Sequence, residues 1–240
     1  MRKILRRTYV AGVIAVFVLI LLAGITQTNA FRSLLKEYLT AAVAQNTRGT
    51  LTLGSLQGNL ITSVRLSDIT LAVDGLPILQ ADELALSYDP FFLITGRLNI
   101  RSARLLNPAI RVWRGKDSLW MFEHVLLPSE VDTSASSFRL RVRRISVIDG
   151  TLFFTDSLGL ARQDTARATS RVEALDYASL QIDNFNLSAS ADVAPGRTAW
   201  TIGELSLDVR KPAFSVREFR GSFSVGAQSS FARNVTLVTG

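Results

Sequence analysis

The 240-residue sequence contains no cysteine and a single histidine. These absences exclude a disulfide framework, a zinc finger, a cysteine nucleophile and a metal centre built from several histidines. The phosphate-binding motif GxxxxGK[ST] is also missing, so the sequence shows no energy source of its own. His124, next to Glu123, has no recognisable nucleophile or orienting partner. We therefore expect no catalytic site, no cofactor and no bound metal ion.

Positive charge is concentrated at the N-terminus. Residues 1–37 hold six basic side chains against one acidic side chain, whereas the other 203 residues hold 21 basic and 19 acidic ones. Nucleic-acid-binding proteins normally gather their basic side chains on the surface that meets the phosphates. The nearly neutral body therefore argues against nucleic acid as a partner, although the net charge of the chain is +7.

An uncharged segment of 18 residues, Tyr9 to Thr26, follows the basic cluster RKILRR. At about 1.5 Å per residue it would span roughly 27 Å, close to the ~30 Å hydrocarbon core of a bilayer. We expect residues 1–30 to be a cytoplasmic tip and a retained transmembrane anchor, oriented by the positive-inside rule. A cleaved signal peptide ending at Ala30 is the alternative, but its apolar region would usually have only about 7–15 residues. Both interpretations export the rest of the chain.

Residues 31–49 show helical periodicity, and Gly49 offers a stop. We expect an amphipathic helix whose apolar side caps the domain that follows. A helix lying on the outer surface of the membrane is the alternative, which the few basic residues on its polar side disfavour. The apolar side comprises Phe31, Leu34, Leu35, Tyr38, Leu39, Ala42 and Val43.

Beyond Gly49 the apolar residues follow the two-residue period of strands with one apolar face. A more particular spacing, i, i+2, i+5 and i+7, also recurs. Pure alternation would place i+5 on the opposite face from i and i+2, so a β-bulge or bend is needed between i+2 and i+5. The repeat predicts a mainly β fold with a bent sheet that keeps its apolar side concave or covered. Ordinary β-sandwich strands with this spacing by chance are the alternative. The copies begin at Val64, Leu79, Leu98, Leu140, Leu180 and Trp200, with a partial copy at Phe214.

Turn-forming residues and polar stretches divide this region. We expect a first β segment over residues 50–128, with a short helix over 117–127 that Asp117 caps. A polar linker or loop over 129–137 separates it from a second β segment over 138–240. Roughly a dozen strands about 4.8 Å apart would make a trough on the order of 60 Å long.

Two runs, Gly49 to Leu71 and Leu79 to Arg114, resemble the N-terminal region of AsmA-like proteins. The similarity lies first in the Gly-x-Leu turn at Gly58. It continues in a strand that is followed by Asp-Pro and then by Leu-x-x-Gly-Arg-Leu, ending at Leu98, and in the Pro-x-Ile motif at Pro108. This resemblance implies an N-terminal transmembrane helix, an amphipathic helix and a taco-shaped β-sheet with an apolar groove. It also implies a single-pass protein of the inner membrane with its body in the periplasm.

The resemblance implies transport of phospholipid between the inner and outer membranes, through a groove that does no covalent chemistry. A scaffold for outer-membrane protein assembly, acting with an outer-membrane β-barrel partner, is the alternative function, whereas an exported enzyme is disfavoured. Because AsmA-like chains of the kind it most resembles are much longer, we also expect this chain to lack a C-terminal part. The predicted groove residues are Val64, Leu66, Ile69, Leu71, Leu84, Leu86, Leu98, Ile100, Leu140, Val142, Ile145, Val147, Leu180, Ile182, Phe185, Leu187, Trp200, Ile202, Leu205 and Leu207.

Overall fold

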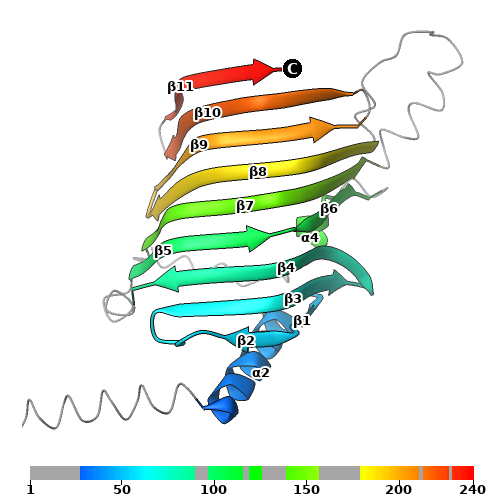
Figure 1. Ribbon diagram of the computed structural model, residues 1–240, viewed down its shortest axis with the longest axis vertical. Coiled ribbons are helices and arrows are strands. Elements are labelled where there is room, and N and C mark those ends of the chain that lie inside the picture. The colour runs from blue at the N-terminus through cyan, green and yellow to red at the C-terminus, as the bar shows by residue number, and fades with distance from the viewer. Residues whose placement is uncertain are drawn as a thin grey trace, which may run out of the picture.

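The computed structural model of the protein describes residues 28–89, 97–115, 119–125, 139–156, 179–210, 213–226 and 229–240. These residues form one curved sheet of 11 strands with helices on one face (Figure 1). The mainly β fold and the curvature of the sheet are therefore confirmed. The predicted anchor over 1–30 lies outside the described residues except for its last three positions, and the predicted linker over 129–137 lies outside them altogether. Within the described ranges, no helix is both long and apolar enough to cross a membrane.

Antiparallel pairing dominates the sheet, whose order is β1-β3-β4-β5-β7-β8-β9-β10-β11. Strand β2 also pairs with β3, while β7 runs parallel to both β5 and β6. Both predicted β segments thus contribute to one sheet. The strands are β1 (Gly49–Thr52), β2 (Ser55–Gln57), β3 (Ser63–Val73), β4 (Leu76–Tyr88), β5 (Arg97–Leu106), β6 (Ala109–Arg114), β7 (Arg139–Asp156), β8 (Ser179–Ala194), β9 (Arg197–Val209), β10 (Phe214–Gly226) and β11 (Ser230–Thr239).

Two positions in the sheet are shared by two short strands. Strands β1 and β2 both lie against β3, and β5 and β6 both lie between β4 and β7. The chain breaks between β5 and β6 because Asn107 has a positive φ of 48° and Pro108 has no N–H to donate. The described strands therefore fill nine positions, which span about 40 Å and not the 60 Å expected from a dozen separate strands.

The expected interruption between i+2 and i+5 is seen in β3. Asp68 lies there with φ of 51°, and Leu66 and Ile69 on either side of it belong to the same buried cluster. Ala81 and Leu84, at the matching positions of β4, pack in that cluster too. Because both strands carry the extra residue at the same level, β3 and β4 stay in register across the interruption, and the register shifts only further on, between Leu71 and Ala72.

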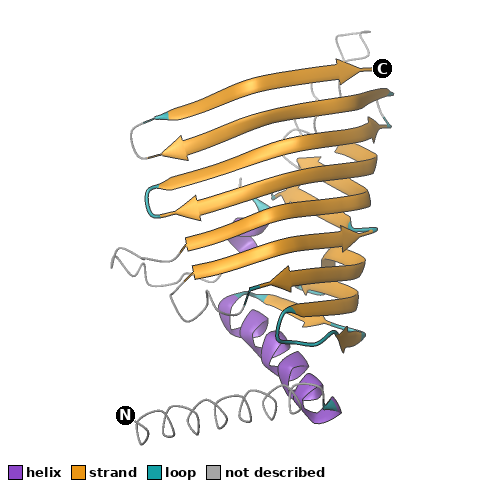
Figure 2. Ribbon diagram, turned by 60° about the vertical axis from the view of Figure 1, so that its left-hand side comes forward, coloured by secondary structure: helices purple, strands orange, loops and turns teal. Residues whose placement is uncertain are grey.

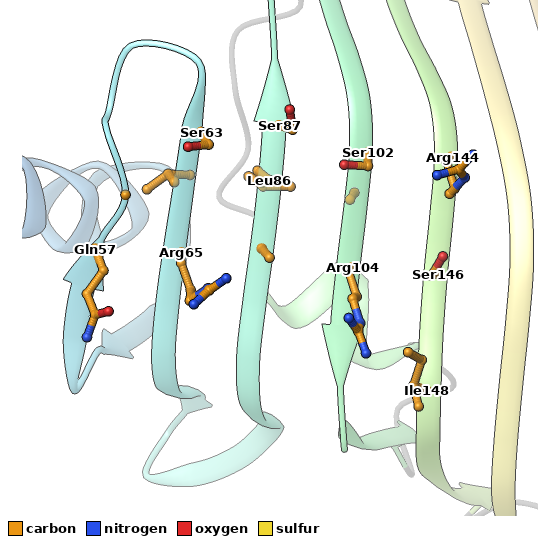
Figure 3. A pocket seen from close by; sticks show the side chains of 14 residues that line it. Gln57, Ser63, Arg65, Leu86, Ser87, Ser102, Arg104, Arg144, Ser146 and Ile148 are labelled. Atoms are coloured by element: carbon orange, nitrogen blue, oxygen red, sulfur yellow. The ribbon is translucent and has the colours of Figure 1, made fainter.

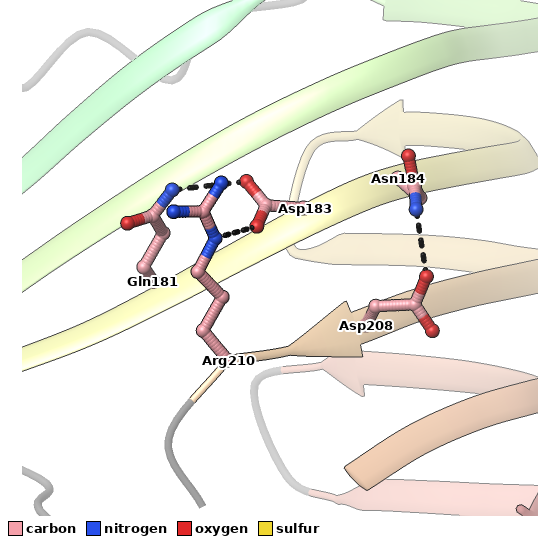
Figure 4. Close-up of polar contacts among 5 residues, drawn as sticks. All are labelled: Gln181, Asp183, Asn184, Asp208 and Arg210. Carbon is pink, nitrogen blue, oxygen red and sulfur yellow. Dashed lines mark hydrogen bonds and ion pairs between the residues drawn. The ribbon is translucent and has the colours of Figure 1, made fainter. Parts of the chain in front are cut away.

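A second interruption of this kind lies in β8. Asn184 has φ of 51° between Ile182 and Phe185, and its Nδ2 donates to Oδ2 of Asp208 on β9 at 2.7 Å (Figure 4). In β7 the register with β8 shifts between Val142 and Ile145. Asparagine and aspartate tolerate the left-handed backbone better than most residues, which explains their use at these bends. The strands bend toward the side that carries the helices (Figure 2).

Helix α2 (Asn29–Asn46) covers one end of the sheet. The Oγ1 atom of Thr28 caps it by accepting the backbone N–H of Phe31 at 3.3 Å. Phe31, Leu35 and Leu39 pack against the buried cluster, as expected for a cap. Tyr38, in contrast, is 70 % exposed, so part of the predicted apolar side faces away from the sheet.

Both helices differ from the prediction at their ends: α2 begins at Asn29 and not at residue 31, and the predicted cap of the second helix, Asp117, lies outside the described residues. Helix α2 ends at Asn46 because Thr47 is already extended, and Gly49 is the first residue of β1 and not a helix stop. The second helix, α4 (Met121–Val125), falls inside the predicted 117–127. Val125 packs with Val73 and Ile78 in a second buried cluster on the same face of the sheet as α2.

Candidate functional site

The face of the sheet that carries α2 and α4 is called the inner face, and the opposite one the outer face. One cross-strand row of apolar side chains on the inner face, the long ladder, runs through nine strands from β2 to β11. Each member is the register partner of the next, so the apolar surface is continuous from strand to strand. The long ladder consists of Leu56, Leu66, Leu84, Leu105, Val147, Leu187, Leu205, Phe219 and Leu237.

Further apolar ladders flank the long ladder. The register joins the predicted groove residues of different strands, although they are far apart in the sequence. One flanking ladder consists of Leu71, Leu79, Ile110, Leu152, Ile182, Val209 and Phe214. A second consists of Val64, Leu86, Ala103, Ile145, Ala189 and Ile202. A third consists of Ile100, Val142, Ala191, Trp200 and Phe223. A shorter one joins Leu98, Leu140 and Val193, and the remaining predicted residues form the pairs Ile69 with Ala81, Leu180 with Phe154, Phe185 with Gly150, and Leu207 with Val216.

Burial changes along the long ladder. Leu56 and Leu66 are 7 % and 9 % exposed, because α2 packs over this end. At the other end Leu237 is 59 % exposed, and Trp200 on a neighbouring ladder is 39 % exposed. The helices pack in two buried clusters, and the strand residues of both clusters lie in β1 to β5. Within the described ranges, the inner face of β8 to β11 is therefore an apolar surface that neither helix covers.

Several inner-face residues are not among the predicted groove residues, although Phe219 belongs to the partial copy of the repeat that begins at Phe214. Phe219 and Phe223 of β10 stack with their ring centroids 6.2 Å apart, and Ile110 and Leu152 continue the ladder from Leu79 across β6 and β7. Phe154 contacts Trp120 at 5.7 Å between ring centroids. Neither β6 nor the second half of β7 carries the repeat, but the simple alternation of apolar residues in these two stretches could have found Ile110, Leu152 and Phe154.

Ion pairs cross between strands away from the apolar ladders. Arg141 reaches Asp192 at 3.0 Å, and Arg101 reaches Asp89 at 3.2 Å. Asp183 accepts from both Gln181 and Arg210 (Figure 4). Partial burial raises the pKa of Asp183, but the two hydrogen bonds and the positive charge of Arg210 outweigh it, so that pKa is lowered.

The outer face carries a second feature, a pocket of about 600 Å³ over β3, β4, β5 and β7. Its lining includes the arginines Arg65, Arg104 and Arg144 together with several serines (Figure 3). None of these arginines or serines belongs to the predicted groove residues. The alternation of arginine with apolar residues in RLNIRSARL and LRVRRISV is the signal that could have found Arg104 and Arg144.

The described residues contain no group of three or more side chains suited to hold a metal ion. Comparison with known proteins adds no identification: no family model matches the chain, and no curated protein matches its sequence significantly. The resemblance to AsmA-like proteins is thus still a prediction. What can be argued about function comes from the inner and outer faces themselves.

Proposed function

We propose that this chain is an AsmA-like, TamB-like protein anchored in the inner membrane, whose inner face carries the acyl chains of phospholipids across the periplasm. The observation that supports the proposal most strongly is the long ladder, which stays apolar over nine strands while the exposed fraction of its side chains rises from 9 % at Leu66 to 59 % at Leu237. A purely structural core would be covered along its whole length. A contiguous apolar surface that is left partly exposed to solvent often marks a place where an apolar partner binds.

The energetics of such a carrier need no catalytic residue. Each CH₂ group that leaves water for an apolar surface gains about 0.8 kcal/mol. A lipid tail that moves from one strand to the next exchanges one apolar contact for a similar one. Movement along the ladders would therefore be close to isoenergetic, and its direction would come from supply and removal of lipid at the two ends.

The position of α2 is consistent with this function. It follows directly after the predicted anchor, and its inward side chains, such as Leu35, cover the first ladder residues. Leu34 and Tyr38 are 65 % and 70 % exposed on the same helix. We propose that these two side chains meet the membrane surface, so that lipid enters the ladders beside α2.

Site-specific photo-crosslinking tests the proposal. A photoreactive amino acid replaces Leu205 on the long ladder in one variant and exposed Glu204, the preceding residue on the opposite face, in a matched control. The two positions differ in face but not in strand or distance from the membrane. We expect phospholipid adducts at Leu205 and none at Glu204. Equal lipid labelling of both positions, or protein adducts alone at Leu205, would contradict lipid carriage.

One observation favours the alternative function, a scaffold that adds strands of a client or of an outer-membrane β-barrel partner. Every residue of β11 is exposed, and β11 pairs with β10 alone among the described strands. Such an edge can accept another strand through its free N–H and C=O groups. Crosslinkers along β11, at Val235 for example, should then capture a β-barrel protein, and their labelling should fall when Thr236 is replaced by proline.

A further inference from the structure

The pocket on the outer face has a floor of small side chains. Ser63, Ser87 and Ser102 are register partners on β3, β4 and β5. Ala85 lies two residues before Ser87 on β4 and lines the same pocket. Serine and alanine are poor strand formers and bury little area against their neighbours. A contiguous patch of them on three adjacent strands does little to stabilise the sheet, but it leaves a hollow.

Arginines surround this hollow (Figure 3). Arg65 and Arg104 are both register partners of Ala85, one on each side, so their side chains flank the smallest residue of the floor. Arg144 lines the pocket from β7. A volume of about 600 Å³ lies within the range of small-molecule sites.

The positive charge at the pocket is only partly compensated. Arg65 reaches Glu83 through Nε at 3.5 Å, whereas Arg104 and Arg144 form no ion pair or hydrogen bond within the described part of the chain. Arg104 and Arg144 thus leave two positive charges at the pocket that a bound anion would neutralise.

We propose that the outer-face pocket is a binding site for a phosphate group, held by Arg65, Arg104 and Arg144 and by the serine hydroxyls of its floor. Three guanidinium groups and several hydroxyls offer more donors than the two oxygens of one carboxylate can accept, whereas the oxygens of a phosphate suit them. Guanidinium groups also match phosphate geometry through paired N–H donors. Because the site lies on the face opposite the apolar ladders, the proposal does not depend on lipid carriage.

Calorimetric titration of the full chain in nonionic detergent with inorganic pyrophosphate tests the site. The double variant Arg104→Gln/Arg144→Gln should bind about 100-fold more weakly, because each charge-assisted contact contributes about a factor of ten. Ala85→Leu leaves the net charge unchanged but fills the floor, and should weaken binding at least about tenfold. The matched control, Arg197→Gln/Arg217→Gln, removes the same charge from exposed positions outside the pocket and should bind as the unaltered chain does.

Three results would overturn the proposal: no saturable binding by the unaltered chain, an equal loss in the control, or full binding by Ala85→Leu. Full binding by Ala85→Leu would mean that pyrophosphate is attracted by the overall positive charge of the surface and does not occupy the pocket. Mixed micelles then identify the source of the phosphate. Displacement of pyrophosphate by micelles with phosphatidylglycerol, but not with phosphatidylcholine, assigns the site to an anionic lipid headgroup. Displacement by neither assigns it to a soluble phosphate compound.

Discussion

Substitutions at two leucines of the long ladder, Leu66 and Leu205, should have different consequences. Leu66 and Leu205 have the same side chain and the same inward orientation, and they differ in what covers them. Leu66 is 9 % exposed in the buried cluster that packs against α2, whereas Leu205 is only half-buried, on a strand that neither described helix reaches. We expect substitution by alanine to lower the free energy of unfolding more at Leu66 than at Leu205. We expect a charged side chain at Leu205 to weaken lipid binding.

The magnitudes follow from the burial. Leu66→Ala removes a nearly buried side chain from a packed cluster and should cost about 3 kcal/mol of unfolding free energy, within the ~2–5 kcal/mol range for buried leucines. Leu205→Ala should cost about 1 kcal/mol, because this side chain is partly exposed and no described helix packs over it, so less transfer free energy is lost than at a buried leucine. For a domain of this size, ~3 kcal/mol lowers the melting temperature by roughly 6–12 °C and ~1 kcal/mol by roughly 2–4 °C.

Thermal unfolding followed by circular dichroism measures the first effect, and displacement of a fluorescent fatty acid measures the second. Leu205→Asp should fold with a small loss of stability but bind the fatty acid at least about tenfold more weakly, because the tail would have to desolvate a carboxylate. Glu204→Gln, on the opposite face, serves as the control and should bind normally. If Leu205→Asp unfolds the protein, or binds the fatty acid as well as the control, the uncovered ladder is not a binding surface.

Other substitutions test the bends and the covered end. Gly58→Ala should cost about 3 kcal/mol or more, because φ is 108° and a Cβ would lie 2.6 Å from a backbone oxygen. Gly75→Ala should cost only about 1–2 kcal/mol, since φ is 77° but no atom lies within 4 Å; equal losses in urea unfolding would refute the distinction. Asn184→Ala should cost about 1–2 kcal/mol by losing the bond to Asp208, and Asn184→Gly less because glycine relaxes the backbone; calorimetry should rank them so. Burial raises the pKa of Tyr88 above 10.0, so the folded state holds this proton more tightly and loses stability as pH rises past about 10. The urea midpoint between pH 8 and 11 should therefore fall more steeply in the unaltered chain than in Tyr88→Phe.

Much of the fold follows from local patterns. The i, i+2, i+5, i+7 repeat located β3, β4, β5, β7, β8 and β9 and predicted an interruption that Asp68 and Asn184 now explain. The pattern works because an extra residue is the simplest way to return i+5 to the apolar face. Helical periodicity, in contrast, could not place the helix ends well. The helix ends before Thr47 because the backbone there is extended, and apolar spacing carries no information about that local geometry.

Many members of the apolar ladders were predictable from the sequence, but their arrangement was not. Each predicted groove residue has an apolar or glycine register partner, yet nothing in the sequence says that Leu105 pairs with Val147 in a parallel ladder or that Leu187 pairs with Leu205. The outer pocket was missed because Arg65, Ala85 and Arg104 meet only through pairing between three strands. Their separation in the sequence carries no signal of that contact.

By itself, the sequence determined which side chains face together within each strand, because the two-residue period and its interruptions are properties of a single chain segment. Only the tertiary structure decided the order and register of the strands, and with them the continuity of the ladders. It also decided that α2 covers Leu66 while Leu237 stays exposed. The physical reason is that pairing and cover depend on contacts between distant segments, whose free energy no local pattern contains.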